Sequence, residues 1–177
     1  METAERCVAA PERPAHFDAL VAVDWGSYEG DPHFALFGHS DFTSRKLIIE
    51  DELELRGGTL RMLFDAVKEK ERQLWGVNGW DGTMLALKDW KRENVPPWLA
   101  AKIEAKAPRQ PYLRVCDNDL ALALEALGHG VALLPSAKHE KHIWMDALDA
   151  AVRRDGIIVH PRCKRLREQL MTTVWNK

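Results

Sequence analysis

Two aspartates stand where apolar strands are expected to end, and this placement points to metal chemistry. Asp24 follows the run "ALVAV", and Asp117 follows "YLRVC" just before a predicted helix. A carboxylate beside a packed core costs free energy unless a cation or hydrogen-bond donors compensate it. Ligands of open α/β sheets bind at the carboxyl ends of strands, so two such acids could share a divalent cation. Oxygen ligands favour Mg²⁺ or Mn²⁺ over zinc.

Each of these acids also has a simpler interpretation. Asp117 could cap the helix that follows it, and Asp24 could accept hydrogen bonds from backbone N–H groups of the next turn. Two more acids lie nearby in the sequence: Asp31, after the first turn, and Asp119, a candidate helix cap. The residues alone leave the metal and capping interpretations open.

Composition predicts one soluble domain from a reducing compartment. The chain has 177 residues, is 46% hydrophobic and carries a formal net charge of -2, so overall charge does not indicate nucleic-acid binding. Its 3 cysteines have no paired spacing, which argues against a disulfide framework. No window approaches the roughly 20 apolar residues of a membrane span, and the N-terminus lacks the apolar run of a signal peptide. We therefore expect a cytoplasmic protein without membrane contact.

Hydrophobic periodicity predicts three strands, then a helix, then alternating strands and helices. The first three strands, expected at 19–25, 33–41 and 45–55, have short links typical of an antiparallel meander. A helical period follows, with Thr59 as its N-cap. Further strands are expected at 112–117, 131–137 and 157–161, each followed by a helix, the last of which Pro161 opens.

This order predicts an α/β fold in which helices flank a mixed sheet. Residues 1–16 contain two prolines, several charges and little periodicity, so we interpret them as a flexible tail or linker remnant. Residues 17–177 would form the domain. An irregular insertion at about 77–111 mixes Gly, Pro and Trp with one or two short helices.

Four stretches of the chain resemble the nuclease domain of a tailed-phage terminase large subunit, part of a DNA-packaging motor. They are "RPAHFDALVAVDWG", "FTSRKLIIEDELEL", "YLRVCDNDLALAL" and "GIIVHPRCKRLREQLMTTVWNK". The resemblance implies a ribonuclease H-like fold and an endonuclease that cuts concatemeric phage DNA with two Mg²⁺ or Mn²⁺ ions. It also implies as partners double-stranded DNA, a terminase ATPase domain, a small terminase subunit and a portal protein.

Under this resemblance, Asp24 and Asp117 match the metal-binding acids that end two strands of the family's sheet. Asp31 matches an acid after the first turn, which orients the site or joins its ligands, and Asp119 is a reserve ligand. Lys138 and Lys141 lie near the position of a lysine that approaches the active site, where it neutralises a phosphate or steadies the attacking water.

A basic cluster near the C-terminal end supplies candidate DNA contacts. It consists of Arg162, Lys164, Arg165 and Arg167. At helical spacing, Arg162 and Arg165 share one face, and Lys164 and Arg167 share another. Such side chains can hold backbone phosphates without reading the base sequence. An ordinary charged outer face is the alternative interpretation.

Two parts of the family pattern fall outside this sequence. The family's third metal-binding acid lies beyond "VWNK" in a later GH-x-D stretch, and its ATPase carries a G-x-x-x-x-G-K-[ST] loop, which does not occur here. We therefore expect a piece of that protein, truncated at Lys177. Two other functions stay open: a catalytically inactive module that docks on DNA or the motor, and another ribonuclease H-like nuclease such as a Holliday-junction resolvase.

Overall fold

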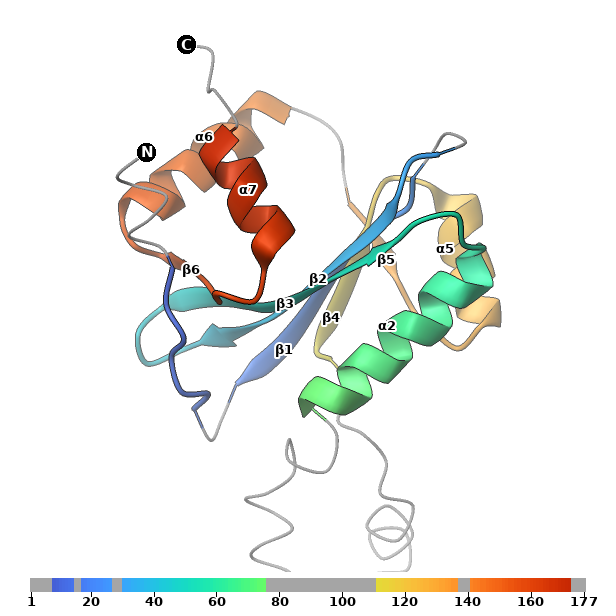
Figure 1. The fold of residues 1–177 in the computed structure, drawn as a ribbon, viewed down its shortest axis with the longest axis horizontal. Helices are drawn as coiled ribbons and strands as arrows, with labels where there is room; N and C mark the ends of the chain where they lie inside the picture. The colour runs from blue at the N-terminus through green and yellow to red at the C-terminus, as the bar shows by residue number, and fades with distance from the viewer. Residues whose placement is uncertain (1–7, 15–16, 27–29, 76–110, 137–140, 173–177) are drawn as a thin grey trace, which may run out of the picture.

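A mixed six-stranded sheet with helices on both faces organises the protein (Figure 1). The computed structural model describes residues 8–14, 17–26, 30–75, 111–136 and 141–172. This architecture confirms the predicted α/β class. Within those ranges, no helix combines the length and the apolar character that crossing a membrane requires.

The elements follow one another in the predicted order. They are β1 (Asp18–Asp24), β2 (His33–Asp41), β3 (Lys46–Leu55), α2 (Leu60–Trp75), β4 (Leu113–Cys116), α5 (Leu120–Gly128), β5 (Leu134–Pro135), α6 (Lys141–Arg153), β6 (Ile157–Val159) and α7 (Lys164–Thr172). Thr59 caps α2 as predicted, because its Oγ1 accepts a hydrogen bond from the Met62 backbone N–H at 3.3 Å. The insertion expected at about 77–111 lies almost entirely outside the described residues.

The strands lie in the order β5-β4-β1-β2-β3-β6. β1, β2 and β3 pair antiparallel, which confirms the predicted meander. β4 then joins β1, and β6 joins β3, both in parallel. A parallel partner needs a crossover connection, so segments distant in the sequence complete each side of the sheet.

One face of the sheet forms the main core with α2 and α5 (Figure 1). Successive strand side chains point to opposite faces, and on β1 the buried residues Ala19, Val21 and Val23 alternate with more exposed ones. Phe64 and Trp75 of α2 are fully buried against this face. The alternation fixes which β1 side chains face the opposite side.

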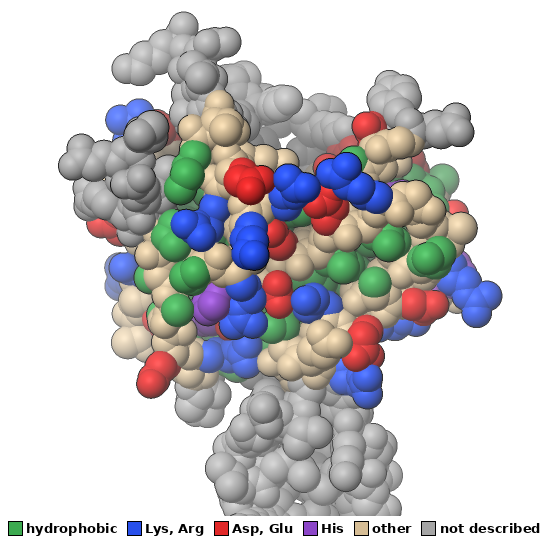
Figure 2. Space-filling view, viewed as in Figure 1, with side chains coloured by type: hydrophobic (Ala, Val, Ile, Leu, Met, Phe, Trp, Pro, Cys, Tyr) green, Lys and Arg blue, Asp and Glu red, His purple; other side chains and the backbone are tan. Residues whose placement is uncertain are grey.

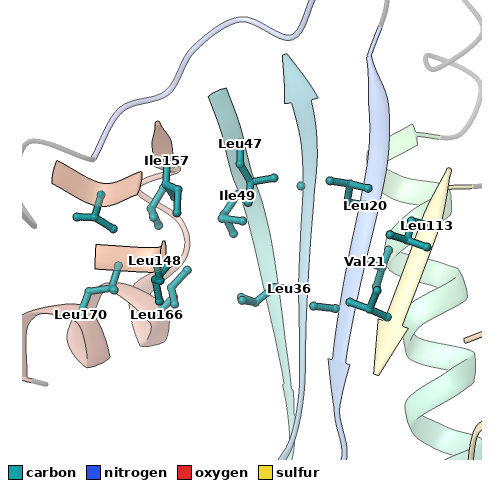
Figure 3. Close-up of a pocket in the computed structure, with 15 residues that line it drawn as sticks. Leu20, Val21, Leu36, Leu47, Ile49, Leu113, Leu148, Ile157, Leu166 and Leu170 are labelled. Atoms are coloured by element: carbon teal, nitrogen blue, oxygen red, sulfur yellow. The ribbon is translucent and has the colours of Figure 1, made fainter. Parts of the chain in front are cut away.

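The opposite face of the sheet is also apolar, and it meets α6 and α7 (Figure 3). Leu20, Leu36 and Leu113 of the sheet line a groove of about 360 Å³ together with Leu148 of α6 and Leu166 of α7. The groove wall is almost entirely hydrocarbon. Both faces of the sheet therefore present apolar surface, as expected for a sheet between helical layers.

A buried carboxylate in β3 joins the N-terminal segment to α2. Arg13 donates to both carboxylate oxygens of Glu50, at 2.7 and 2.6 Å, and Trp75 Nε1 donates to Oε2 at 3.2 Å. His39 Nδ1 lies 2.7 Å from Glu50 Oε1. Arg13 also donates to the Leu74 carbonyl at 2.9 Å, near the end of α2. A charge this deep is tolerated because several partners compensate it.

Residues 8–10 run beside the edge of the sheet. Val8 forms a parallel bridge with Val159, and the Ala9 N–H donates to the Val159 carbonyl at 3.2 Å. Part of the segment that the sequence assigns to a tail or linker thus contacts β6.

A second buried ion pair fastens β4 to α2. Arg114 Nε and Nη2 donate to the two carboxylate oxygens of Glu71 at 2.6 and 2.7 Å, and the two side chains are only 9% and 7% exposed. A bidentate guanidinium–carboxylate pair fixes orientation as well as distance. The pair therefore holds β4 in place against the main core.

The last helix begins at Lys164, so the prediction that Pro161 opens it is wrong. Its first backbone N–H groups need acceptors. Glu52 of β3 supplies them, because its two carboxylate oxygens accept from the N–H groups of Arg165 and Leu166 at 2.8 and 2.9 Å. The cap comes from a distant strand instead of from the residues before the helix.

The Glu50 cluster predicts a pH-dependent loss of stability. Burial raises the pKa of the Glu50 carboxyl, but contacts with His39 and Arg13 outweigh burial and lower it from 4.5 to about 2. A lowered folded pKa gives stability that is present above the unfolded value and is lost as pH falls through the folded value. Between about pH 5 and pH 2, urea denaturation should show a free energy of unfolding that falls by about 3 kcal/mol more in the parent chain than in Glu50→Gln. Parallel pH profiles for the two chains would contradict this account.

Candidate active site

Asp24 and Asp117 lie at neighbouring strand ends. β1 and β4 are parallel, and their register pairs Val23 with Cys116. Asp24 is the last residue of β1, and Asp117 directly follows β4, so each stands one residue beyond that pair. The structure thus brings together two acids that lie far apart in the sequence.

The two side chains also share a face of the sheet. Val23 and Cys116 are buried in the main core beneath α2 and α5. Because strand side chains alternate, the following residues, Asp24 and Asp117, point toward the side that carries α6 and α7. Asp24 is exposed and Asp117 is half-buried. Solvent can therefore reach this pair from one side.

The described residues on either side of the turn after β1 are held close to the sheet. Trp25 is buried and anchors the chain directly after Asp24. The Gly26 N–H donates to His33 Nδ1 at 3.2 Å, and His33 Nε2 donates to the Gly58 carbonyl at 3.1 Å. A Cβ at Gly26 would lie 2.4 Å from the Asp31 carbonyl oxygen, so the backbones of these two residues touch. This contact brings the exposed Asp31 close to the end of β1.

Asp119 caps α5, as its capping interpretation predicted. Its carboxylate accepts from the Leu122 N–H at 3.1 Å. Asp117 is not the helix cap; its Oδ1 accepts from the neighbouring Asn118 N–H at 2.8 Å. A metal-ligand role for Asp119 stays a prediction.

Cys116, beside the acids, is an inert core residue. Burial, and then the charges of Asp117 and Asp119, raise the pKa of its thiol to about 11. The thiol therefore stays protonated at neutral pH and is a poor nucleophile.

The two lysines predicted for the site cannot be placed beside it. Lys138 lies outside the described residues. Lys141 begins α6, but its side chain is not described. Their roles near a phosphate stay predictions.

Two carboxylates on one accessible face suit a hard divalent cation, because Mg²⁺ and Mn²⁺ prefer oxygen ligands. In the part of the chain that the structure describes, no three His, Cys, Asp or Glu side chains gather into a metal site. A metal-ligand role for Asp24 and Asp117 therefore stays a prediction.

The arginines of the predicted basic cluster each bind a different partner within the protein. Arg162 Nε donates to His160 Nδ1 at 3.0 Å, and Arg167 Nη1 donates to the Pro161 carbonyl at 3.2 Å. Burial, and then the charge of Arg162, lower the pKa of His160. Lys164 is exposed. Figure 2 shows acidic and basic side chains interspersed on the side of the molecule that carries α7.

Arg165 belongs to a network that sequence reasoning missed. Its Nε donates to Glu54 of β3 at 3.0 Å, and its Nη1 donates to Glu168 at 3.1 Å. Arg56 Nε donates to the other oxygen of Glu54 at 2.6 Å, and this hydrogen bond is the main reason that the pKa of Glu54 is lowered. The only trace of this network in the sequence is the alternation of acids in "EDELEL". That alternation by itself indicates no more than the polar side of a half-covered strand.

The comparisons with known proteins give matches in structure only. No protein-family model matches the chain, and no curated protein sequence matches it. Among solved structures, the large terminase of a thermophilic bacteriophage superposes with a TM-score of 0.57 at 12% identity, over 97% of this chain and 36% of that one. The chain thus spans about a third of that protein's length.

Isolated nuclease domains match as well. The P22 large terminase nuclease domain gives a TM-score of 0.56 at 15% identity, over 94% of this chain and 74% of that one. The g2p large terminase nuclease domain of bacteriophage SPP1, solved with bound Mn, gives 0.52 at 16% identity, over 90% and 71%. The chain therefore has the fold of phage large terminase nuclease domains, which confirms the predicted ribonuclease H-like class.

The contact at Gly26 predicts that a single methyl group will disturb this end of the sheet. Gly26→Ala should lower the free energy of unfolding by about 1–3 kcal/mol, since the added carbon meets backbone and not a movable side chain. Gly128→Ala is the control: a Cβ there meets nothing within 4 Å, and alanine favours a helix. Urea denaturation of the two variants tests the difference, and equal stabilities would contradict the close contact.

Proposed function

We propose that the chain is the nuclease domain of a phage DNA-packaging terminase and that it cuts DNA by metal-dependent hydrolysis. The observation that carries the proposal is the adjacency of Asp24 and Asp117 on one face of a fold shared with terminase nuclease domains. The SPP1 nuclease domain was crystallised with bound Mn, which supports a divalent cation as the cofactor. Concatemeric phage DNA would be the substrate, in the host cytoplasm.

Asp24 and Asp117 would hold the ions through their carboxylate oxygens, at the point where β1 and β4 end together. Two Mg²⁺ or Mn²⁺ ions bound there would supply Lewis acidity to activate a water and to stabilise the leaving oxygen of a phosphodiester. Asp31, held next to Gly26, would orient the site or join the ligands. Lys138 and Lys141 would neutralise charge on the phosphate.

Other components of the packaging motor would determine where cutting occurs. Metal ions held at the ends of β1 and β4, together with exposed basic side chains, would contact the phosphates of DNA. Phosphates carry no sequence information. We therefore expect low sequence preference. A terminase ATPase domain, a small terminase subunit and a portal protein would then provide the timing and position of the cut.

A second candidate is a catalytically inactive module that docks on DNA or on the packaging motor. The small number of possible metal ligands favours this module. Within the described ranges, no third His, Cys, Asp or Glu side chain gathers with Asp24 and Asp117. A site with few ligands binds cations weakly. Metal-dependent cutting separates this candidate from the nuclease.

A supercoiled-plasmid nicking assay with Mn²⁺, Mg²⁺ or EDTA tests the proposed nuclease. Asp24→Asn and Asp117→Asn should each reduce nicking by roughly 100-fold or more, because each removes a charged ligand from the reacting centre. Asp18→Asn is the matched control, since Asp18 begins the same strand that Asp24 ends. Nicking that persists in EDTA, or that both ligand variants retain, would refute the assignment. A parent chain that does not cut would favour the docking module.

A further inference from the structure

A polar groove lies on the opposite side of α7 from the apolar one. Its volume is about 350 Å³, and it lies between the start of β2, the end of β3 and α7. Phe34, Glu54, Arg56 and Arg165 are among the residues that line it. Leu166 of α7 instead faces the apolar groove. α7 therefore presents an apolar side to the sheet and a polar side to this groove.

The polar groove starts beside the candidate metal ligands. Asp24 of β1 pairs with Phe34 of β2, and Phe34 pairs with Glu54 of β3. These three residues form one row across the sheet, on the face that carries α7. Paired residues of antiparallel strands lie about 4.5–5.5 Å apart, so the Glu54 backbone is about 10 Å from that of Asp24. A nucleic-acid strand rises about 3.4 Å per nucleotide along the helix axis, so this span corresponds to at most about three nucleotides.

Glu54 holds two guanidinium groups in the polar groove. Arg56 Nε donates to one carboxylate oxygen at 2.6 Å, and Arg165 Nε donates to the other at 3.0 Å. Each arginine donates one Nε–H hydrogen bond to Glu54, and a phosphate oxygen can accept the same donor in place of the carboxylate. The arginine side chains are 69% and 52% exposed, whereas Glu54 is 20% exposed. Exposed ion pairs contribute little net free energy, so an incoming phosphate can exchange for the carboxylate.

We propose that the polar groove is a subsite for a DNA backbone phosphate, formed by Arg56 and Arg165, in which Glu54 is a built-in competitor. This inference rests on the proposed nuclease function, because the bound phosphate would lie a few nucleotides from the one cut at Asp24 and Asp117. In the free protein, Glu54 and Glu168 together balance the charge of the two arginines, and Glu54, which contacts both, keeps the groove preorganised. In the complex, a phosphate takes over one or both guanidinium groups.

Removing the competitor and removing the arginines should have opposite effects. In EDTA, where no cutting occurs, fluorescence anisotropy with a labelled random-sequence duplex measures binding alone. Glu54→Gln should bind the duplex about two- to fivefold more tightly, and Arg56→Gln and Arg165→Gln about three- to tenfold more weakly. Each arginine variant should also reduce the slope of log affinity against log salt by about 0.9 per lost phosphate contact.

The chain offers a matched control pair on α2, on the other face of the sheet. Arg72 Nε donates to Glu69 Oε2 at 3.0 Å, and both side chains are exposed. Glu69→Gln and Arg72→Gln make the same charge changes away from the groove. Each should change the affinity for the duplex only by the small effect of one distant charge. Thermal unfolding of all five variants identifies any that is not folded.

The outcomes separate the subsite from the proposed function. If the parent chain binds duplex and nicks plasmid, but the groove variants behave like the α2 controls, the subsite is wrong and the nuclease assignment stands. If Glu54→Gln weakens binding while it stays folded, Glu54 is not a competitor and the inference is overturned. A parent chain that neither binds duplex nor nicks plasmid refutes the proposed function, and the subsite with it.

Discussion

The parallel pairing of β1 with β4 is the constraint on which the candidate site depends. Its register places Val23 beside Cys116, and so sets Asp24 beside Asp117. A slip of one residue would turn every side chain of β4 to the other face, which would bury Asp117 in the core. The buried pair between Arg114 and Glu71 opposes such a slip, because it fixes β4 to α2 from the core side.

The ion pairs on the two faces of the sheet differ in burial and therefore in their role. On the α2 face, Glu50 and Glu71 are buried with bidentate arginine partners, and losing a partner would leave a costly unpaired charge. On the α7 face, Glu52 caps the helix, and the pairs that Arg165 makes are exposed to solvent. Buried pairs of this kind fix the frame, whereas exposed pairs cost little to rearrange. The pairs of Arg165 are therefore open to exchange with a charged ligand, whereas the pairs of Glu50 and Glu71 are not.

Local patterns in the sequence are enough to predict the strands, the helices and their order, because strand and helix periods persist through each segment. Contacts between distant segments are not predictable in this way. Local patterns misplace the start of α7, because its cap, Glu52, lies 113 residues before Arg165. The pairing of Glu54 with Arg165 spans 111 residues and has no local signature. Asp24 and Asp117 are recognisable as strand ends, but only the β1–β4 register makes them neighbours.

The most direct test of a shared metal site is Mn²⁺ affinity, measured by isothermal titration for the parent chain, Asp24→Asn, Asp117→Asn and the double variant. If both carboxylates hold the same ion, each single change removes most of the affinity and the double variant loses little more, since the two effects are coupled. Losses that add independently, or single variants that bind Mn²⁺ as the parent does, would contradict a common ion at the ends of β1 and β4.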